Sequence, residues 1–207
     1  MRDVFTQIYR TNKWGSDESK SGKGSSLAQT QKVREALPGL FQSYKIQSVL
    51  DLPCGDFHWM KEVDLRGMDY TGADIVPELI AETQARYAAP GRRFVTLNLT
   101  TDSLPKTDIL MCRDCWVHLN TSDIADAIVN IRRSGITYLL ATTFTNHPVN
   151  RDKVRGKFRM LNLRIAPFHF PTPLLVISED NLESSHADAG KSLALWRVED
   201  LPDPRLP

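Results

Sequence analysis

The sequence has 207 residues, of which 26 are basic and 25 acidic, so its formal net charge is +1, and 41% of its residues are hydrophobic. These values are ordinary for a globular protein, and a chain of this length buries a sizeable core without disulfides or metal ions. The balanced charge provides no global field that would attract nucleic acid or an anionic membrane, so we expect neither as a partner.

The first 26 residues predict an arm that precedes a single domain over residues 27–207. Residues 15–26 are mostly Gly, Ser and charged side chains without apolar periodicity, which is typical of a loop. A helix is predicted over residues 27–44, where apolar side chains recur at helical spacing, although Pro38 and Gly39 could end it early.

Strands and helices then alternate up to residue 144. Short apolar runs predict buried strands at residues 46–52, 69–75, 93–97, 108–113 and 138–144. Helices are predicted at residues 57–63, 77–87 and 121–133. Pro77 suits a first helical turn, and Thr121 or Ser122 is expected to cap the last helix. This alternation indicates a parallel sheet built from right-handed βαβ units.

The last third of the sequence has a different character. Residues 146–170 are polar and basic, and residues 145–172 are expected to form loops on the acceptor side of a site. Two further strands are predicted at residues 174–178 and 193–198, forming an antiparallel hairpin at one sheet edge. The expected fold is therefore α/β: a Rossmann-like doubly wound sheet of about seven strands, mostly parallel, with helices on both faces.

The three cysteines, Cys54, Cys112 and Cys115, are a poor disulfide framework, and a single C-x-x-C spacing does not make a zinc site. The Cys112–Cys115 pair could serve a redox role or pack at a strand end. The N-terminus does not resemble a signal peptide, and no apolar run approaches the ~20 residues that span a bilayer. We expect a cytoplasmic protein without a bound metal.

Ligands of open α/β sheets sit beyond the carboxyl ends of the strands. The first strand ends in Asp51-Leu52-Pro53-Cys54-Gly55-Asp56, where Gly55 leaves room for the backbone to approach a ligand. Asp74 ends the second strand, 23 positions after Asp51, where an acid commonly accepts hydrogen bonds from ribose hydroxyls. The alternative is a purely structural turn with a solvated aspartate.

The pattern resembles the class I S-adenosylmethionine-dependent methyltransferases, and more closely a bacterial subgroup with a D-x-P-C-G-D-F-x-W-M signature, matched at residues 51–60. That subgroup's S-G-x-G-S, C-R-D-x-x-x-H-L and N-L-x-x-x-P-F runs are matched at residues 21–25, 112–119 and 162–168, so the resemblance covers nearly the whole chain. The wider superfamily has glycines where Pro53 and Phe57 stand; the subgroup shares both departures. The turn should therefore be stiffer, with Phe57 packed beneath it.

The resemblance implies a cofactor, S-adenosylmethionine, with S-adenosylhomocysteine as product. Its methionine part is expected beside Asp51, Pro53, Cys54, Gly55 and Asp56, with Arg113 pairing with the carboxylate. The resemblance further implies Asp74 at the ribose, Ile75 against the adenine, and Asn98 with Leu99 near the adenine amino group. Residues 15–26 resemble a lid, with Trp14 and Ser25 touching the cofactor; the alternative is a simple linker.

Methyl transfer needs an aligned acceptor and, for a hydroxyl, a general base. Asp114 and His118 follow the fourth strand and would share a helical face, so either could be the base, or His118 could be structural. Basic residues alternate along residues 151–159, which would suit an acidic or phosphorylated acceptor, or simply form a solvated loop. The candidate acceptor contacts are Asn146, Arg155, Arg159 and Asn162.

The function expected is transfer of a methyl group to a small polar acceptor, such as a sugar or sugar phosphate. A non-catalytic S-adenosylmethionine-binding partner of another enzyme would look similar. An NAD-dependent dehydrogenase would want G-x-G-x-x-G after the first strand, and residues 53–57 read P-C-G-D-F instead.

Overall fold

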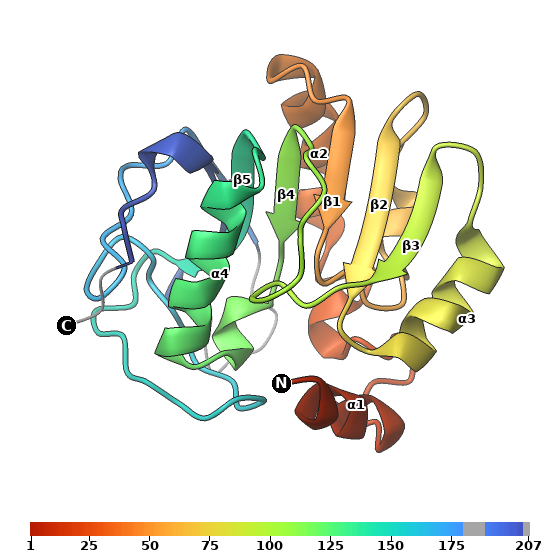
Figure 1. Cartoon of the computed structure of the whole chain (residues 1–207), viewed down its shortest axis with the longest axis horizontal. Helices are drawn as coiled ribbons and strands as arrows, with labels where there is room; N and C mark the ends of the chain where they lie inside the picture. Colours follow the sequence, from red (N-terminus) through yellow and green to blue (C-terminus); the bar gives the residue numbers. More distant parts are fainter. Residues whose placement is uncertain (180–188, 205–207) are drawn as a thin grey trace.

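The computed structural model describes residues 1–179 and 189–204 (Figure 1). Within them, seven strands form one sheet in the order β3-β2-β1-β4-β5-β7-β6. The strands are β1 (Ser48–Asp51), β2 (Asp69–Asp74), β3 (Arg92–Thr96), β4 (Ile109–Cys112), β5 (Tyr138–Phe144), β6 (Leu175–Ser178) and β7 (Lys191–Arg197). The helices are α1 (Arg2–Arg10), α2 (Gln31–Ser43), α3 (Pro77–Tyr87) and α4 (Thr121–Arg133), joined by 3-10 turns η1 (Lys23–Ser25), η2 (Met60–Glu62), η3 (Trp116–His118) and η5 (Val198–Asp200).

The first five strands are parallel, which brings their carboxyl ends to a single edge of the sheet. β7 runs antiparallel between β5 and β6, pairing Tyr138 with Arg197 and Phe144 with Lys191. β7, the last strand in the sequence, therefore lies inside the sheet, and β6 forms the edge of the sheet. This arrangement confirms the expected Rossmann-like α/β fold with an antiparallel C-terminal pair.

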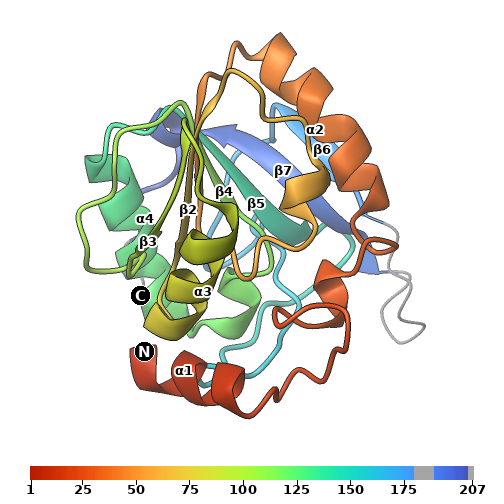
Figure 2. The same cartoon turned by 90° about the vertical axis from the view of Figure 1, so that its right-hand side faces the viewer.

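Helices cover both faces of the sheet (Figure 2). α4 packs one face with Ile124, Ile128 and Ile131, which join the strand residues Leu50 and Leu110 in one apolar cluster. α2 packs the other face, and its buried side chains belong to a second cluster: Val33, Leu37, Leu40 and Phe41. Each such side chain contributes about 1.5–3 kcal/mol when fully buried, so these contacts fix the sheet and thereby the positions of its strand ends.

Three local predictions are wrong. The helix expected at residues 57–63 is reduced to the 3-10 turn Met60–Glu62, because Phe57 has φ +58° and is buried against the rings of Tyr70 and Phe94. The cap of α4 is Asn120, whose side chain accepts the Asp123 N–H, so neither Thr121 nor Ser122 fills that role. The helix expected from residue 27 begins at Gln31 and continues through Pro38 to Ser43.

The N-terminal arm turns back over the carboxyl ends of the strands. α1 lies beneath the arrowheads of β1 and β2 in Figure 1. It is held to α3 by two side chains: the Tyr9 hydroxyl donates to Glu82 over 2.8 Å, and Arg10 Nε donates to Glu78 over 3.0 Å. Among the described residues, no helix has both the length and the apolar character that crossing a bilayer would require.

Candidate active site

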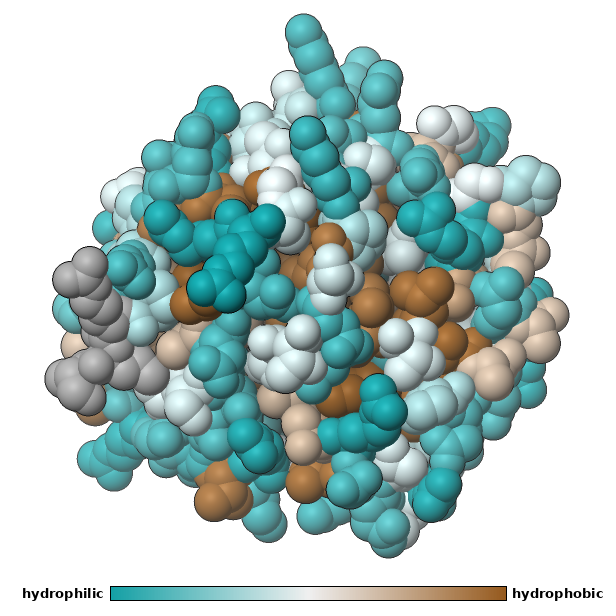
Figure 3. Space-filling model, in the orientation of Figure 1, coloured by the Kyte–Doolittle hydropathy of each residue, from teal (hydrophilic) through white to brown (hydrophobic). Residues whose placement is uncertain are grey.

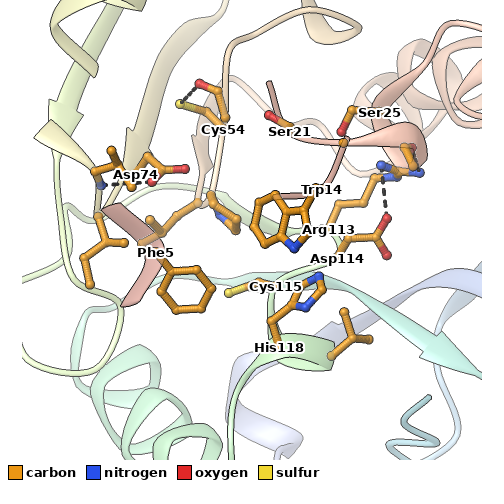
Figure 4. Close-up of a pocket in the computed structure, with 18 of the residues that line it drawn as sticks. Phe5, Trp14, Ser21, Ser25, Cys54, Asp74, Arg113, Asp114, Cys115 and His118 are labelled. Atoms are coloured by element: carbon orange, nitrogen blue, oxygen red, sulfur yellow. Dashed lines mark hydrogen bonds and ion pairs between the residues drawn. The ribbon is translucent and has the colours of Figure 1, made fainter. Parts of the chain in front are cut away.

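A cavity of about 320 Å³ lies where the carboxyl ends of β1, β2 and β4 meet the arm. Figure 4 shows side chains from these strand ends and from the arm facing the same space. In the orientation of Figure 1 the surface is mostly hydrophilic, and apolar atoms gather towards its middle (Figure 3). Eleven of the predicted site residues line this cavity: Trp14, Ser25, Pro53, Cys54, Gly55, Asp74, Ile75, Leu99, Arg113, Asp114 and His118.

The turn after β1 is built around Gly55. Its φ is +56°, in the left-handed region where a side chain is strained. A Cβ atom at this position would also overlap the hydroxyl of Ser21 in the arm. The glycine predicted to let a ligand approach thus also lets the arm approach the turn.

Asp74 ends β2 with only 7% of its surface exposed, and Oδ1 accepts the Val76 N–H over 3.0 Å. Burial raises the pKa of this carboxyl to about 6, although hydrogen bonds from backbone N–H groups oppose the rise. Beside it, Ile75, Leu97 and Leu99 line an apolar part of the cavity. A carboxylate next to an apolar wall suits a ligand with hydroxyl groups adjacent to a flat ring.

Asp51 lies outside the cavity lining, under the strand ends. The Tyr70 hydroxyl donates to its Oδ2 over 2.6 Å. Burial raises the pKa of Asp51 to about 7, while this hydrogen bond and the charge of Arg113 pull it down. Asp51 therefore joins β1 to β2 through its hydrogen bond with Tyr70 and supports the strand ends without lining the cavity.

Four charged side chains meet beside the cavity, three of them buried and Asp114 partly exposed: Arg113, Asp114, Glu179 and Lys191. Arg113 donates to both Glu179 oxygens, over 3.2 and 2.6 Å, and to the Gly24 carbonyl over 2.8 Å. Lys191 Nζ lies 2.7 Å from Asp114 Oδ2 and 3.4 Å from Glu179 Oε2. Two positive and two negative charges neutralise each other and join β4, β7, the residue after β6 and the arm.

This network decides what Asp114 can do chemically. Burial alone would raise the pKa of Asp114, but the charges of Lys191 and Arg113 outweigh it and hold that pKa well below its usual range. Burial likewise disfavours charge on Arg113, yet Glu179 and Asp114 keep its pKa above the usual value. Asp114 is thus a permanently ionised partner of Lys191 with little affinity for a proton, which makes it a poor general base.

His118, in η3, differs from Asp114 in its surroundings, because aromatic rings rather than charged partners lie beside it. Its ring lies between those of Trp14, with centroids 5.1 Å apart, and Phe158, at 6.0 Å. Its Nδ1 atom is buried and has no hydrogen-bond partner. Burial lowers the pKa of His118 to about 4, with the Asp114 charge opposing that shift. At neutral pH the ring is uncharged and can accept a proton.

The arm is fastened over the cavity mainly by Asp56. Its carboxylate accepts from the Ser19 hydroxyl (2.9 Å), the Lys20 N–H (2.8 Å) and the Ser21 hydroxyl (3.3 Å). Asp56 does not line the cavity. It lies behind the turn, where its carboxylate holds residues 19–21 of the arm through these hydrogen bonds. We call Asp56 the latch of the arm.

The four predicted acceptor contacts do not reach the cavity, and neither does Asn98. Arg155 donates to Asp123 (Nη2–Oδ1, 2.6 Å), and buried Arg159 donates to the Leu119 carbonyl over 2.8 Å. Asn162 donates to the carbonyls of Thr145 and His147. Asn146 lies beside Gly190, and the Asn98 side-chain oxygen accepts from Thr100. These side chains therefore make hydrogen bonds or contacts within the protein rather than facing the cavity.

Several residues that the structure brings to the site had no predicted role. Phe5 lines the cavity from α1, and Phe144 from the end of β5. Glu179 and Lys191 complete the charge network from 66 and 77 positions beyond their partners Arg113 and Asp114. The helical spacing of Phe5 and Tyr9 is a local sequence signal that could have identified Phe5. Glu179 and Lys191 have no such signal, because their partners lie far away in the sequence.

Neither a scan of protein-family models nor a search of curated proteins finds a match to this chain. Solved structures do resemble it. The 1,6-didemethyltoxoflavin-N1-methyltransferase of Burkholderia thailandensis, with bound 1,6-didemethyltoxoflavin and S-adenosylhomocysteine, superposes with a TM-score of 0.64 at 18% identity, over 95% of this chain and 86% of that one.

Two further structures show the same likeness. Magnesium protoporphyrin IX methyltransferase from Synechocystis PCC 6803, with bound S-adenosylmethionine, gives a TM-score of 0.61 at 12% identity over 95% of this chain and 96% of that one. Human N-acetylserotonin methyltransferase in complex with S-adenosylmethionine gives 0.58 at 15% identity; the match covers 94% of this chain but 59% of that one. At these identities the shared feature is the fold of S-adenosylmethionine-dependent methyltransferases.

Proposed function

We propose that the protein binds S-adenosylmethionine and transfers its methyl group to a small-molecule acceptor, with S-adenosylhomocysteine as the second product. The observation that supports this most is the meeting of the Asp74 carboxylate and the Gly55 turn in one cavity at the carboxyl ends of parallel strands. This is the position at which open α/β sheets bind their ligands.

Each part of the cavity suits one part of the donor. Asp74 would accept hydrogen bonds from the ribose hydroxyls, and Ile75 with Leu99 would hold the adenine ring. The Pro53–Gly55 turn, with Trp14 and Ser25 above it, would enclose the methionine part. When bound there, the donor supplies an electrophilic methyl carbon on its sulfonium; the protein's own task is to orient the acceptor and exclude water.

Arg113 is better suited to a positioning role than to pairing with the donor's carboxylate. Its Nε and Nη2 atoms bind Glu179, and Nη1 lies 3.3 Å from Asp114. The guanidinium also donates to the Gly24 carbonyl of the arm and lies over the ring of Trp59. We infer that Arg113 holds the lid closed over the donor.

Of the two candidate bases, the geometry favours His118, because Asp114 is already paired with Lys191. The sugar class of acceptor depended on Asn146, Arg155, Arg159 and Asn162, which lie outside the cavity lining. Support for a sugar or sugar phosphate therefore falls away, and a small-molecule acceptor of another class has to be considered.

Calorimetry with S-adenosylmethionine, S-adenosylhomocysteine and NAD tests the donor assignment. We expect saturable binding of the first two and none of NAD, and weaker binding in Asp74→Asn. The control is Asp69→Asn, at the exposed opposite end of β2. Absence of S-adenosylmethionine binding, or equal loss in both variants, would refute the proposal. Formation of S-adenosylhomocysteine with an acceptor, followed by mass spectrometry, separates an enzyme from a non-catalytic binding partner.

A further inference from the structure

A chain of aromatic rings crosses one side of the cavity. The ring centroids are 6.5 Å apart for Phe5 and Trp14, 5.1 Å for Trp14 and His118, 6.0 Å for His118 and Phe158, and 6.1 Å for Phe158 and Phe144. All five side chains line the cavity, and Figure 4 shows Phe5, Trp14 and His118 gathered on one side of it. They come from α1, the arm, η3, β5 and the loop that follows β5. We call these five residues the aromatic wall of the cavity.

Two of these rings keep accessible surface. Trp14 is half-buried, and Phe158 is 39% exposed. Large aromatic side chains contribute most when they are covered. A flat apolar ligand entering between them would remove this surface from water and could stack on both.

The polar groups on this side of the cavity are few. Among the described residues that line it, His118 Nδ1 is the buried side-chain nitrogen or oxygen left without a hydrogen-bond partner. Asp114 and Lys191 are engaged with each other. A sugar would bring several hydroxyls into this space, and each hydroxyl buried without a partner costs about 1–3 kcal/mol. A ligand with one polar hydrogen would leave no such group unpaired.

We propose that the acceptor is a flat aromatic molecule carrying one phenolic or heteroaromatic O–H or N–H, held among Trp14, His118 and Phe158, with its proton accepted by the imidazole of His118. This inference rests on the proposed methyltransferase function and specifies its substrate class. The accepting nitrogen is the one that carries no hydrogen in the neutral ring.

The reaction balances with these groups alone. The acceptor oxygen or nitrogen forms its new bond to the donor's methyl carbon, the carbon–sulfur bond breaks with its electron pair going to sulfur, and the acceptor's proton goes to His118. Asp114 and Lys191 are the charged groups whose fields act on His118. Because burial makes His118 a weak base, it can deprotonate an acidic phenol or heteroaromatic group far more readily than a sugar hydroxyl.

The test uses the full chain with saturating S-adenosylmethionine and two matched acceptor sets: hydroxyquinolines, hydroxyindoles and catechols against hexoses and nucleotide sugars. S-adenosylhomocysteine and the methylated product are measured by mass spectrometry. We expect turnover with members of the aromatic set and at least 100-fold less with the sugars. Trp14→Leu and Phe158→Leu should each raise KM for the aromatic acceptor about 10-fold. In Phe158→Leu the affinity for S-adenosylhomocysteine should stay within 3-fold of that of the parent protein.

His118→Gln separates a base from a structural histidine. With a series of phenols of graded acidity, we expect kcat to fall at least 100-fold for the least acidic phenol and much less for the most acidic, and the rate to rise with pH as the phenol ionises. His147→Gln, which lies outside the cavity lining, should behave as the parent protein.

The outcomes distinguish the two proposals. Turnover of sugars, or S-adenosylmethionine binding with no turnover of any aromatic acceptor, overturns the acceptor class and leaves the donor assignment standing. A uniform loss in His118→Gln for every phenol overturns the role of His118. Failure to bind S-adenosylmethionine at all overturns the proposed function itself, and the acceptor class with it.

Discussion

At the scale of single residues, Asp74 couples donor binding to pH. Its buried carboxyl has a pKa raised to about 6, so in the free protein it is protonated at pH 5 and ionised at pH 7.5. A donor whose hydroxyls donate to this carboxylate stabilises the ionised form. Binding should therefore strengthen as the pH rises towards the pKa and level off above it.

We predict that the affinity for S-adenosylmethionine increases from pH 5 to about pH 7, by up to about 10-fold per unit below the pKa. Asp74→Asn should weaken binding about 10- to 100-fold at pH 7.5, the range of a hydrogen bond to a charged group, and flatten the lower part of the profile. A residual slope near pH 7 would report Asp51, whose pKa burial raises to about 7. Calorimetry from pH 5 to 8 checks this; a flat profile in the parent protein contradicts it.

Gly55 carries a second prediction at this scale. Gly55→Ala places a Cβ at φ +56° and against the Ser21 hydroxyl; the backbone strain alone costs about 1–2 kcal/mol. We expect donor affinity to fall at least 10-fold. Ser21→Gly removes the overlap but not the strain, so the double variant should lose less affinity than the two single losses added together. Strict additivity in calorimetry would show that arm and turn act independently.

At the scale of elements, the arm behaves as a lid whose latch is Asp56. Three donors from residues 19–21 converge on that carboxylate. We predict that Asp56→Ala speeds amide hydrogen exchange over residues 19–25 at least 10-fold and speeds S-adenosylhomocysteine release by a similar factor, with little change in Tm. Stopped-flow displacement and exchange mass spectrometry measure both.

The matched control is Asp64→Ala, an aspartate in the same β1–β2 connection whose hydrogen bonds go to Arg66. It should leave exchange in the arm unchanged. If both variants accelerate exchange equally, or neither does, the arm is held by other contacts and Asp56 is not its latch.

Elements with strong local periodicity were predictable from the sequence. α3, α4 and β5 occur at the expected bounds, because their apolar faces repeat within one element. The helix expected at residues 57–63 failed because its apolar residues serve another purpose: Phe57 packs beneath the turn in a left-handed conformation that helical periodicity does not encode. Its burial there agrees with the packing expected from the turn motif.

The site was predictable to the same extent. Asp74 and the Gly55 turn follow directly from strand ends, so their local sequence was enough. The basic residues of the 151–159 stretch were not: Arg155 and Arg159 are claimed by Asp123 and Asp152 through ion pairs that only the folded chain creates. Charge read along a sequence records which groups are present, whereas their availability to a ligand depends on tertiary partners.

At the scale of the whole molecule, the four-charge network ties distant parts of the chain together. Glu179, whose side chain is fully buried, is the partner of Arg113 and a neighbour of Lys191. Removing one member of a buried network leaves an unpaired charge. We predict that Glu179→Gln lowers the free energy of unfolding by about 3–5 kcal/mol, as measured by denaturant titration.

Glu199→Gln is the control, because the exposed Glu199 pairs with Arg197 at 3.8 Å and such pairs contribute about 0–1 kcal/mol. Adding Lys191→Met to Glu179→Gln restores neutrality and should recover part of the loss. An effect of Glu179→Gln no larger than that of Glu199→Gln would mean that the network does not stabilise the fold.

The docking of the arm also has a consequence for the order in which parts of the chain fold. The Gly24 carbonyl accepts a hydrogen bond from Arg113, 89 positions later in the chain, and Gly24 lies near the ammonium group of Lys191 in β7. The partners that fix Gly24 therefore lie at the ends of β4 and β7, so this part of the arm docks fully only after the sheet that carries those residues has formed. The sheet can form before the arm docks, and ligand competence should appear as a late, separate kinetic phase of refolding.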